Sequence, residues 1–150
     1  MNPVLFESTE NNFDTNGIGI LSDSIFCEVT YERNGILELE MQYPITGIHY
    51  KEIKTRNIIL ASPSPVENTQ PFRIYRITKP INGIITIYGE HISYDLSGIP
   101  VSPFTAGSAA EAMSKLQSNA AIESPFTFWT DKETVATMSV VAPASTRSLL

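Results

Sequence analysis

The sequence has few cysteines and histidines, no long apolar run and no signal-like start, which are the features of disulfide-bonded, metal-binding, membrane-spanning or secreted proteins. Its 150 residues contain one cysteine, one tryptophan and two histidines. A single cysteine excludes an internal disulfide and a cysteine-based zinc site. The longest uncharged stretch, residues 96–110, is interrupted by two prolines and is shorter than a membrane-spanning segment, so no such segment is expected. The first ten residues lack the basic and apolar regions that are typical of a secretory signal.

Positive charge is also scarce, because 10 lysines and arginines face 16 aspartates and glutamates, for a net charge of −6. Binding to a phosphate backbone needs a basic face, so nucleic-acid binding is not expected. The charge is uneven: residues 1–50 carry −7, whereas residues 51–80 carry +4. Such blocks pair either within one molecule or between copies, and the sequence does not separate the two arrangements.

What the sequence does have is a large share of β-branched residues. It contains 18 isoleucines, seven valines and 14 threonines against nine leucines, a bias that favours strands over helices. The composition, 42% hydrophobic and 17% charged, is typical of a globular domain that folds without disulfides or metals. We therefore predict a β-dominated α+β fold made of antiparallel hairpins with one main helix.

The clearest hairpin is predicted over residues 25–43, where two alternating runs meet at Asn34-Gly35. A three-residue loop, residues 33–35, makes one face of the hairpin wholly apolar, with Gly35 in the left-handed conformation. The predicted pairs are Tyr31 with Leu37, Val29 with Leu39, Cys27 with Met41, and Ile25 with Tyr43. The opposite face is acidic, and this register sets Glu28 against Glu40, so that face is expected to meet water or cations.

Further elements are predicted along the rest of the chain. Residues 57–61, 72–79 and 84–90 are expected to form strands, although the register of the 72–90 hairpin cannot be fixed because both parities contain apolar residues. The main predicted helix is residues 109–119, where Ser108 and Glu111 form a capping-box pattern. A final hairpin is expected from residues 126–130 and 135–142, followed by the opening of a helix near Pro143.

Three groups of residues are candidates for a catalytic or metal site. Cys27, His91 and Asp95 suggest a hydrolase site, but Cys27 falls on the apolar hairpin face, where a buried structural thiol is the favoured interpretation. Glu38 and Glu40 lie about 7 Å apart along one strand face and loosely suit a glycosidase pair, yet solvated charges explain them better. His91 and Asp95 are a candidate metal-binding pair, but further ligands are lacking, so a hydrogen-bonded structural histidine is favoured.

Six aromatic residues suggest a sugar platform, although strand-borne aromatics more often pack in a core or an interface. They are Tyr75, Tyr88, Tyr94, Phe126, Phe128 and Trp129. Phosphate-binding, nucleophile-elbow and zinc-protease motifs are absent from the sequence. We therefore assign no catalytic, cofactor-binding or metal-binding residue, expect no cofactor, and do not predict an enzyme.

An ordered set of segments resembles the N-terminal region of phage and prophage tail proteins, the minor structural, tail-associated proteins of siphophages that infect Gram-positive bacteria. The most specific segment is the strand that leads into Glu90-His91 and Ser93-Tyr94-Asp95-Leu96, although many relatives have alanine where this chain has Gly89. The segments are RNGILELEMQYPITGIHY at 33–50, FRIYRITKPINGIITIYGEHISYDL at 72–96, IPVSPFTA at 99–106, SPFTFWTD at 124–131 and STRSLL at 145–150.

The resemblance implies a baseplate hub at the tip of the virion tail. In such proteins this region looks like barrel-like β domains arranged as a ring, usually a homotrimer, that closes the tail tube and connects it to host-recognition or wall-penetrating parts. The implied partners are further copies and other tail proteins, namely the distal tail and tape measure proteins. Any hydrolase activity would lie in C-terminal parts that are outside this chain.

Residues 1–150 are accordingly expected to be the N-terminal part of a longer hub protein, with subdomain boundaries near 62–71 and 97–107. The last residues look like a helix without an ending signal, which suggests that the chain continues. Two alternatives remain: a carbohydrate- or cell-wall-binding module, and a fragment of a tail-associated peptidoglycan hydrolase. For the hub, we expect the acidic hairpin face around Glu28, Glu38 and Glu40 to meet basic side chains of residues 51–79 on a neighbouring copy.

Overall fold

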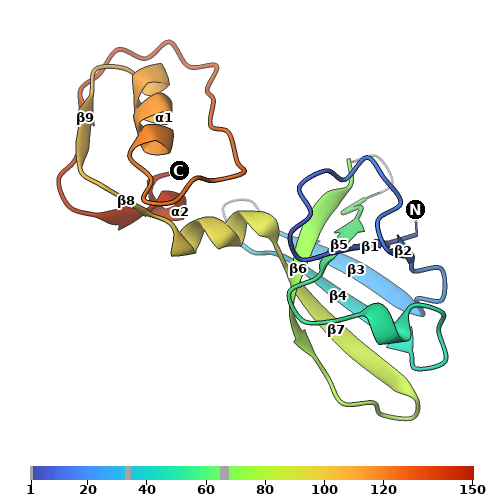
Figure 1. Cartoon of the computed structure of the whole chain (residues 1–150). Helices are drawn as coiled ribbons and strands as arrows, with labels where there is room; N and C mark the ends of the chain where they lie inside the picture. The colour runs from blue at the N-terminus through green and yellow to red at the C-terminus, as the bar shows by residue number, and fades with distance from the viewer. Residues whose placement is uncertain (1, 33–34, 65–67) are drawn as a thin grey trace. The chain divides into compact units, whose positions relative to one another are not determined.

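The computed structural model describes residues 2–32, 35–64 and 68–150 of the chain. It divides into two compact units, Met1–Ile92 and Ser93–Leu150, which are described separately below (Figure 1). The strands Ile58–Ala61 and Gln70–Ile77 pair with each other within the first unit, and residues 97–107 lie inside the second. The division therefore falls between Ile92 and Ser93.

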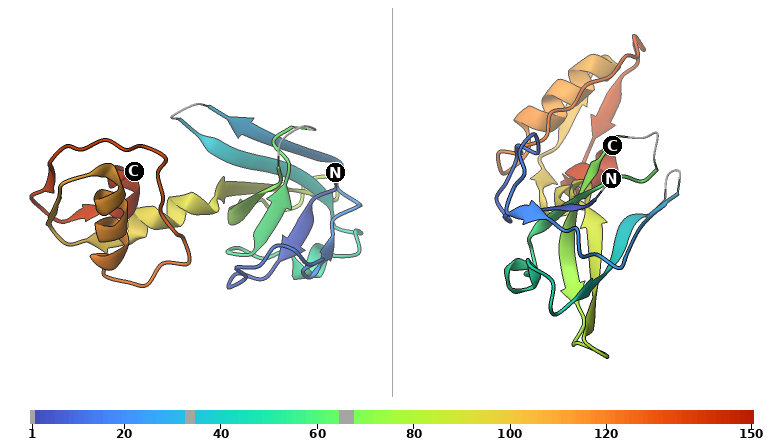
Figure 2. Two further views of the ribbon diagram at one scale, coloured as in Figure 1. Left: turned by 90° about the horizontal axis from the view of Figure 1, so that it is seen from above. Right: turned by 90° about the vertical axis from the view of Figure 1, so that its right-hand side faces the viewer.

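The first unit is a seven-stranded antiparallel sheet that curves into a half-barrel (Figures 1 and 2). The strand order is β2-β1-β5-β6-β7-β4-β3, so β6 is central, β7 and β4 are interior strands, and β2 and β3 are the edges. This confirms the predicted β-dominated α+β class. The elements of this unit are β1 (Val4–Phe6), β2 (Gly19–Ile20), β3 (Phe26–Tyr31), β4 (Leu37–Pro44), the short 3-10 helix η1 (Tyr50–Glu52), β5 (Ile58–Ala61), β6 (Gln70–Ile77) and β7 (Ile84–His91).

The register predicted for the first hairpin is confirmed. Strands β3 and β4 pair Tyr31 with Leu37, Val29 with Leu39, Cys27 with Met41 and Glu28 with Glu40, whereas Ile25 lies just before β3 begins. The Glu32 amide donates to Ile36 O (2.8 Å) and the Gly35 amide to Glu32 O (2.9 Å), which closes a three-residue loop. Arg33 and Asn34 lie outside the described residues, and the Gly35 φ angle depends on Asn34, so its left-handed conformation stays a prediction.

The hairpin of β6 and β7 is the one whose register could not be fixed from the sequence. Its turn and a bulge set that register. Asn82 (φ 52°) and Gly83 (φ 76°) form a two-residue turn closed by reciprocal bonds between Ile81 and Ile84. Strand β6 has one extra residue relative to β7 between Ile74 and Arg76. The bulge leaves Ile74 buried while Tyr75 and Arg76 are both exposed.

One side of the sheet, called here the inner face, carries the core. Its buried side chains come from β1, β4, β5, β6 and β7, from Leu21 after β2, and from Ile53 after η1, so the turn containing η1 packs over this face. The core consists of Leu5, Leu21, Leu39, Met41, Tyr43, Ile53, Ile59, Ala61, Phe72, Ile74, Ile85 and Ile87. The hairpin's apolar face is buried only on β4, because β3 has a neighbour on one side alone.

The second unit combines short helices with two two-stranded sheets, β9-β10 and β8-β11. The predicted helix is confirmed as α1, where Ser108 Oγ accepts from the Glu111 amide (3.2 Å) and Ala112 and Leu116 are buried. The elements are the 3-10 helix η2 (Ile92–Gly98), β8 (Pro100–Val101), β9 (Phe104–Ala106), α1 (Ala109–Ser118), β10 (Met138–Val140), β11 (Ala144–Ser145) and α2 (Thr146–Leu149).

The predicted final hairpin is wrong. Residues 126–130 form no strand, and the strand within 135–142 is β10, which pairs with β9 rather than with a sequence neighbour. Tertiary pairing prevails here because β10 can complete the sheet on which α1 packs. The closing helix also begins later than predicted, since Ser145 and not Pro143 stands at its N-terminus.

Candidate functional site

The most distinctive polar surface is the side of β3, β4, β6 and β7 that faces away from the core, called here the outer face. Side chains alternate along a strand, so residues between the buried core positions of β4 and β7 project to this side. The outer face consists of Glu28, Thr30, Glu38, Glu40, Tyr75, Arg76 and Tyr88, with Glu90 and Arg73 at its margin.

Strand register arranges these residues in two rows. In one row Glu40 lies between Glu28 and Tyr88, and in the other Glu38 lies between Thr30 and Glu90. Two pairs of like charges therefore stand directly opposite each other, Glu28 with Glu40 and Glu38 with Glu90, which is an unfavourable arrangement in isolation. Sequence reasoning found the first pair but not the second, because the second depends on the pairing of β4 with β7.

The middle of the outer face is a shallow hollow of about 190 Å³, lined by Thr30, Glu38, Leu39, Glu40, Tyr75, Arg76 and Tyr88. The Arg76 guanidinium carbon lies 4.0 Å from the centre of the Tyr88 ring, a cation–π contact. The rings of Tyr75 and Tyr88 are 6.4 Å apart. Burial, and secondarily the charge of Glu38, raise the pKa of the Tyr75 hydroxyl.

The hollow carries two carboxylates against the one guanidinium of Arg76, so its chemistry suits a further cationic group. Glu38 and Glu40 offer carboxylate oxygens that accept hydrogen bonds, and the 45% exposed ring of Tyr75 offers an aromatic surface beside them. Glu38 and Glu40 are the candidate glycosidase pair. They share this face with Tyr75 and Tyr88, two of the six aromatic residues considered as a sugar platform. The other four, Tyr94, Phe126, Phe128 and Trp129, belong to the second unit.

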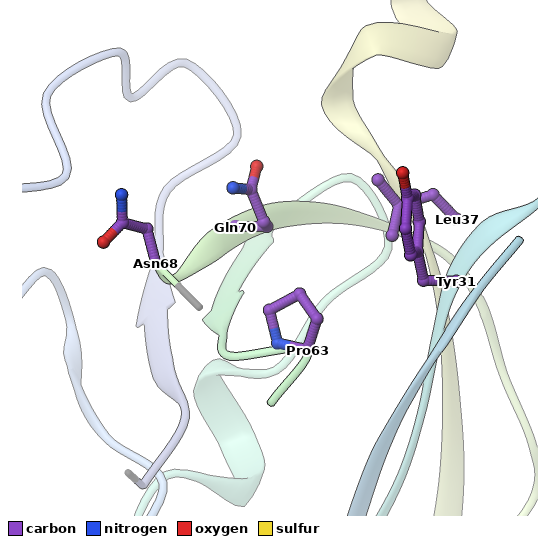
Figure 3. A pocket seen from close by; sticks show the side chains of 5 residues that line it. All are labelled: Tyr31, Leu37, Pro63, Asn68 and Gln70. Carbon is purple, nitrogen blue, oxygen red and sulfur yellow. The ribbon is translucent and has the colours of Figure 1, made fainter. Parts of the chain in front are cut away.

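A second hollow, of about 340 Å³, lies on the first unit. Figure 3 shows Tyr31 beside Leu37, its neighbour across the β3–β4 hairpin, with Pro63, Asn68 and Gln70 as the remaining lining residues. None of these five side chains is charged, so this hollow offers an apolar surface edged by two amides. This hollow could not be predicted from the sequence, because its residues come from three separate segments.

The three residues weighed as a hydrolase site are not assembled into one. Strand β4 separates Cys27 on β3 from His91 at the end of β7, and the register places them roughly 13 Å apart along the strand direction alone. Asp95 belongs to the second unit. His91 Nε2 lies 3.2 Å from Gln70 Oε1 and its ring packs edge-on against Phe72, the structural role that was favoured.

Cys27 itself corrects a prediction. It lies on the apolar side of the hairpin but is exposed, because β3 is the edge of the sheet. Even so, the protein atoms around the thiol raise its pKa to about 11 by desolvation. A thiol with a raised pKa is mostly protonated at neutral pH and is a poor nucleophile.

Metal-binding groups and membrane-spanning helices are both absent from the residues that the structure describes. No group of three or more histidine, cysteine, aspartate or glutamate side chains is arranged there to hold a metal ion. No helix in these ranges is both long and apolar enough to cross a membrane.

Comparisons with known proteins complete the description of the site. No family model and no curated protein matches the sequence. The structure is similar to the crystal structure of prophage tail protein gp18 from Listeria monocytogenes EGD-e, with a TM-score of 0.51 and 15% sequence identity. The match covers 77% of this chain and 32% of that chain, so this chain spans about a third of the solved protein's length. At this identity the likeness establishes the fold: the chain has the fold of part of a prophage tail protein.

Proposed function

We propose that this chain is a structural component of a phage or prophage tail. The observation that carries the proposal is the fold shared with prophage tail protein gp18 over 77% of the chain. The ordered sequence segments that resemble tail proteins support it independently, because they were identified without reference to the fold. In this role the protein works by assembly, so its functional residues are those of its surfaces and not of a catalytic centre.

The more detailed form of the proposal is a baseplate hub at the tail tip. In this form residues 1–150 are the N-terminal part of the hub, copies assemble into a ring, a homotrimer, and the ring closes the tail tube. The adjoining partners are the distal tail and tape measure proteins. The edge strand β3 of the curved sheet supports this form, because its unpaired side is a surface that a neighbouring copy can cover.

Immunogold electron microscopy of phage particles released from the host tests the location. Antibody raised against this chain is applied to intact and to disrupted particles, so that a buried epitope is also reached. Gold at the distal end of the tail is the expected result. Excess purified chain, added as competitor, should abolish the labelling.

The outcome that overturns the tail role is the absence of gold from both intact and disrupted tails. Gold along the tail tube but not at its end would retain a tail role and reject the hub. Absence of labelling together with saccharide-dependent quenching of Trp129 fluorescence would instead favour the carbohydrate-binding alternative, because Trp129 is the single tryptophan and is 80% exposed.

A further inference from the structure

Unneutralised charge of opposite sign lies on opposite sides of the first unit. On the outer face, Glu28 and Glu40 are exposed and Glu38 is half-buried. None of these three carboxylates forms an ion pair within the described residues. The like-charged pairs of this face are unfavourable unless a cation approaches them.

The arginines near this face are already engaged within the same copy. Arg73 Nη1 donates to the carbonyl oxygens of Ser8 and Arg56, both at 2.9 Å, and Arg76 lies over the Tyr88 ring. The net charge of the outer face is negative because its four glutamates outnumber these two arginines. These contacts also remove both arginines from the basic group that the sequence had suggested for the neighbouring copy.

The cations of the second unit are engaged as well. Lys115 Nζ lies 2.7 Å from Glu111 Oε1 and Lys132 Nζ lies 3.7 Å from Asp131 Oδ1. The Arg147 guanidinium lies 3.5 Å from the centre of the Tyr94 ring. Each of these three side chains thus has a partner of its own within its unit.

Lys51, Lys54 and Lys79 are different, because they are exposed and form no ion pair with any described residue, and of these three Lys51 and Lys54 lie together in one turn. Both flank Ile53, which is 8% exposed and belongs to the core on the inner face. The two lysines are therefore carried on the inner side of the sheet. No ion pair of the described residues joins either lysine to Glu28, Glu38 or Glu40, so the lysines of the same copy do not neutralise these carboxylates.

We propose that the outer face of one copy binds the turn carrying Lys51 and Lys54 of a second copy. An ammonium group fits the shallow hollow, where Glu38 and Glu40 accept hydrogen bonds and the Tyr75 ring adds a cation–π contact. Two different surfaces meet in this contact, so it is heterologous and generates a ring or a filament. The inference rests on the proposed function and names the partner surface of that assembly.

Sedimentation velocity of the purified chain tests the contact at about 50 mM and 500 mM salt, since screening acts over roughly 10 Å at 0.1 M. The wild-type chain is expected to self-associate at low salt and to dissociate at high salt. The charge reversals Glu38→Lys with Glu40→Lys, and separately Lys51→Glu with Lys54→Glu, should each weaken association by about tenfold or more, because each replaces attraction with repulsion. Far-UV circular dichroism checks that both variants are folded.

Mixing the two variants gives the decisive result. Each variant alone carries like charges on both surfaces and repels itself, whereas in the mixture every outer face can meet a turn of opposite charge. Association of the mixture should therefore return to near the wild-type level. A matched control, Glu123→Lys with Glu133→Lys, makes the same change in net charge at exposed positions of the second unit and should leave association unchanged.

The inference is overturned if the wild-type chain stays monomeric at low salt, or if the mixture associates no better than its separate components. Either result, combined with gold labelling of tails, would reject this contact and leave the tail role intact. Charge-dependent association combined with unlabelled tails would reject the tail role and retain the contact. The two failures are therefore distinguishable.

Discussion

At the scale of single residues, the turn that carries His49 depends on a glycine in a neighbouring strand. His49 Nδ1 lies 2.5 Å from Glu52 Oε2, and the His49 amide donates to Tyr43 Oη (3.3 Å). These contacts fix the imidazole ring against Gly19 of β2. A Cβ at position 19 would overlap Cε1 and Nε2 of that ring.

Gly19→Ala is expected to destabilise the first unit by about 1–3 kcal/mol, because the His49 ring, bound through Nδ1 to Glu52, cannot easily move away. Urea unfolding followed by far-UV circular dichroism measures the change. In a His49→Ala background the same substitution should cost less than about 0.5 kcal/mol, since the obstacle is gone. Equal costs in the two backgrounds would show that the His49 ring is not what restricts position 19.

Cys27 provides a pH-dependent test at the same scale. Its thiol pKa is about 11, raised by desolvation, so the thiolate fraction at pH 8 is very small. The rate of alkylation by iodoacetamide should rise about tenfold for each pH unit between 8 and 10 and reach half its maximum near pH 11. Mass spectrometry follows the modification, and the urea-unfolded chain, with its ordinary thiol pKa, is the control. A half-maximum below pH 9 in the folded protein would contradict the assigned environment.

At the scale of elements, the interior strand β7 carries core side chains whose truncation would leave a cavity and lower the stability of the sheet. Ile87 is fully buried and pairs with Met41 of β4 and Ile77 of β6. Ile87→Ala should lower the free energy of unfolding by about 2–5 kcal/mol. The matched control is Ile81→Ala, where the side chain is 72% exposed at the hairpin end and a change within about 0.5 kcal/mol is expected.

The N-terminus of α1 provides a second test at this scale. Ser108→Ala removes the cap of the Glu111 amide and should lower the free energy of unfolding by about 1 kcal/mol, whereas Ser114→Ala at an exposed helix position should be neutral or slightly stabilising.

The first turn of α1 also contains a carboxylate with a shifted pKa. Contact with Lys115, and then the Gly107 amide, lower the pKa of Glu111. The contribution of Glu111 is therefore present above its unfolded-state pKa and is lost as pH falls through the lowered value. Helix content measured by circular dichroism from pH 7 to pH 2 should show that loss, and a reduced loss in Glu111→Gln.

At the scale of the whole molecule, hydrogen exchange should separate the regular and irregular parts of the chain. Amides of β4, β6 and β7 have strand neighbours on both sides and should exchange most slowly. Residues 126–137 contain no strand or helix and are largely exposed, so their amides should exchange fastest. Mass-spectrometric exchange over minutes to hours measures both groups. Protection of 126–137 equal to that of β7 would mean that this segment is covered in solution.

How much the sequence could predict differs between the two units. In the first unit, alternation and turn chemistry were sufficient for the β3–β4 register, because a one-residue slip would have buried glutamates. In the second unit the same alternation suggested a local hairpin that does not form. The strands there are only two or three residues long, so local pattern carries little weight against tertiary pairing.

The sequence by itself determined the β-dominated class, the first hairpin, the capped helix and the acidic character of one hairpin face, because each depends on local spacing and on turn or cap chemistry. Only the tertiary structure decided that β3 is an edge, which exposes Cys27, and that β4 pairs with β7, which brings Glu38 and Glu40 beside Tyr75 and Tyr88. It also decided that Arg73 binds backbone carbonyls and that Arg76 lies over Tyr88, whereas Lys51 and Lys54 form no ion pair with a described residue. These facts depend on contacts between residues far apart in the chain, and the hydrophobic core that fixes those contacts exists only when the whole sheet has formed.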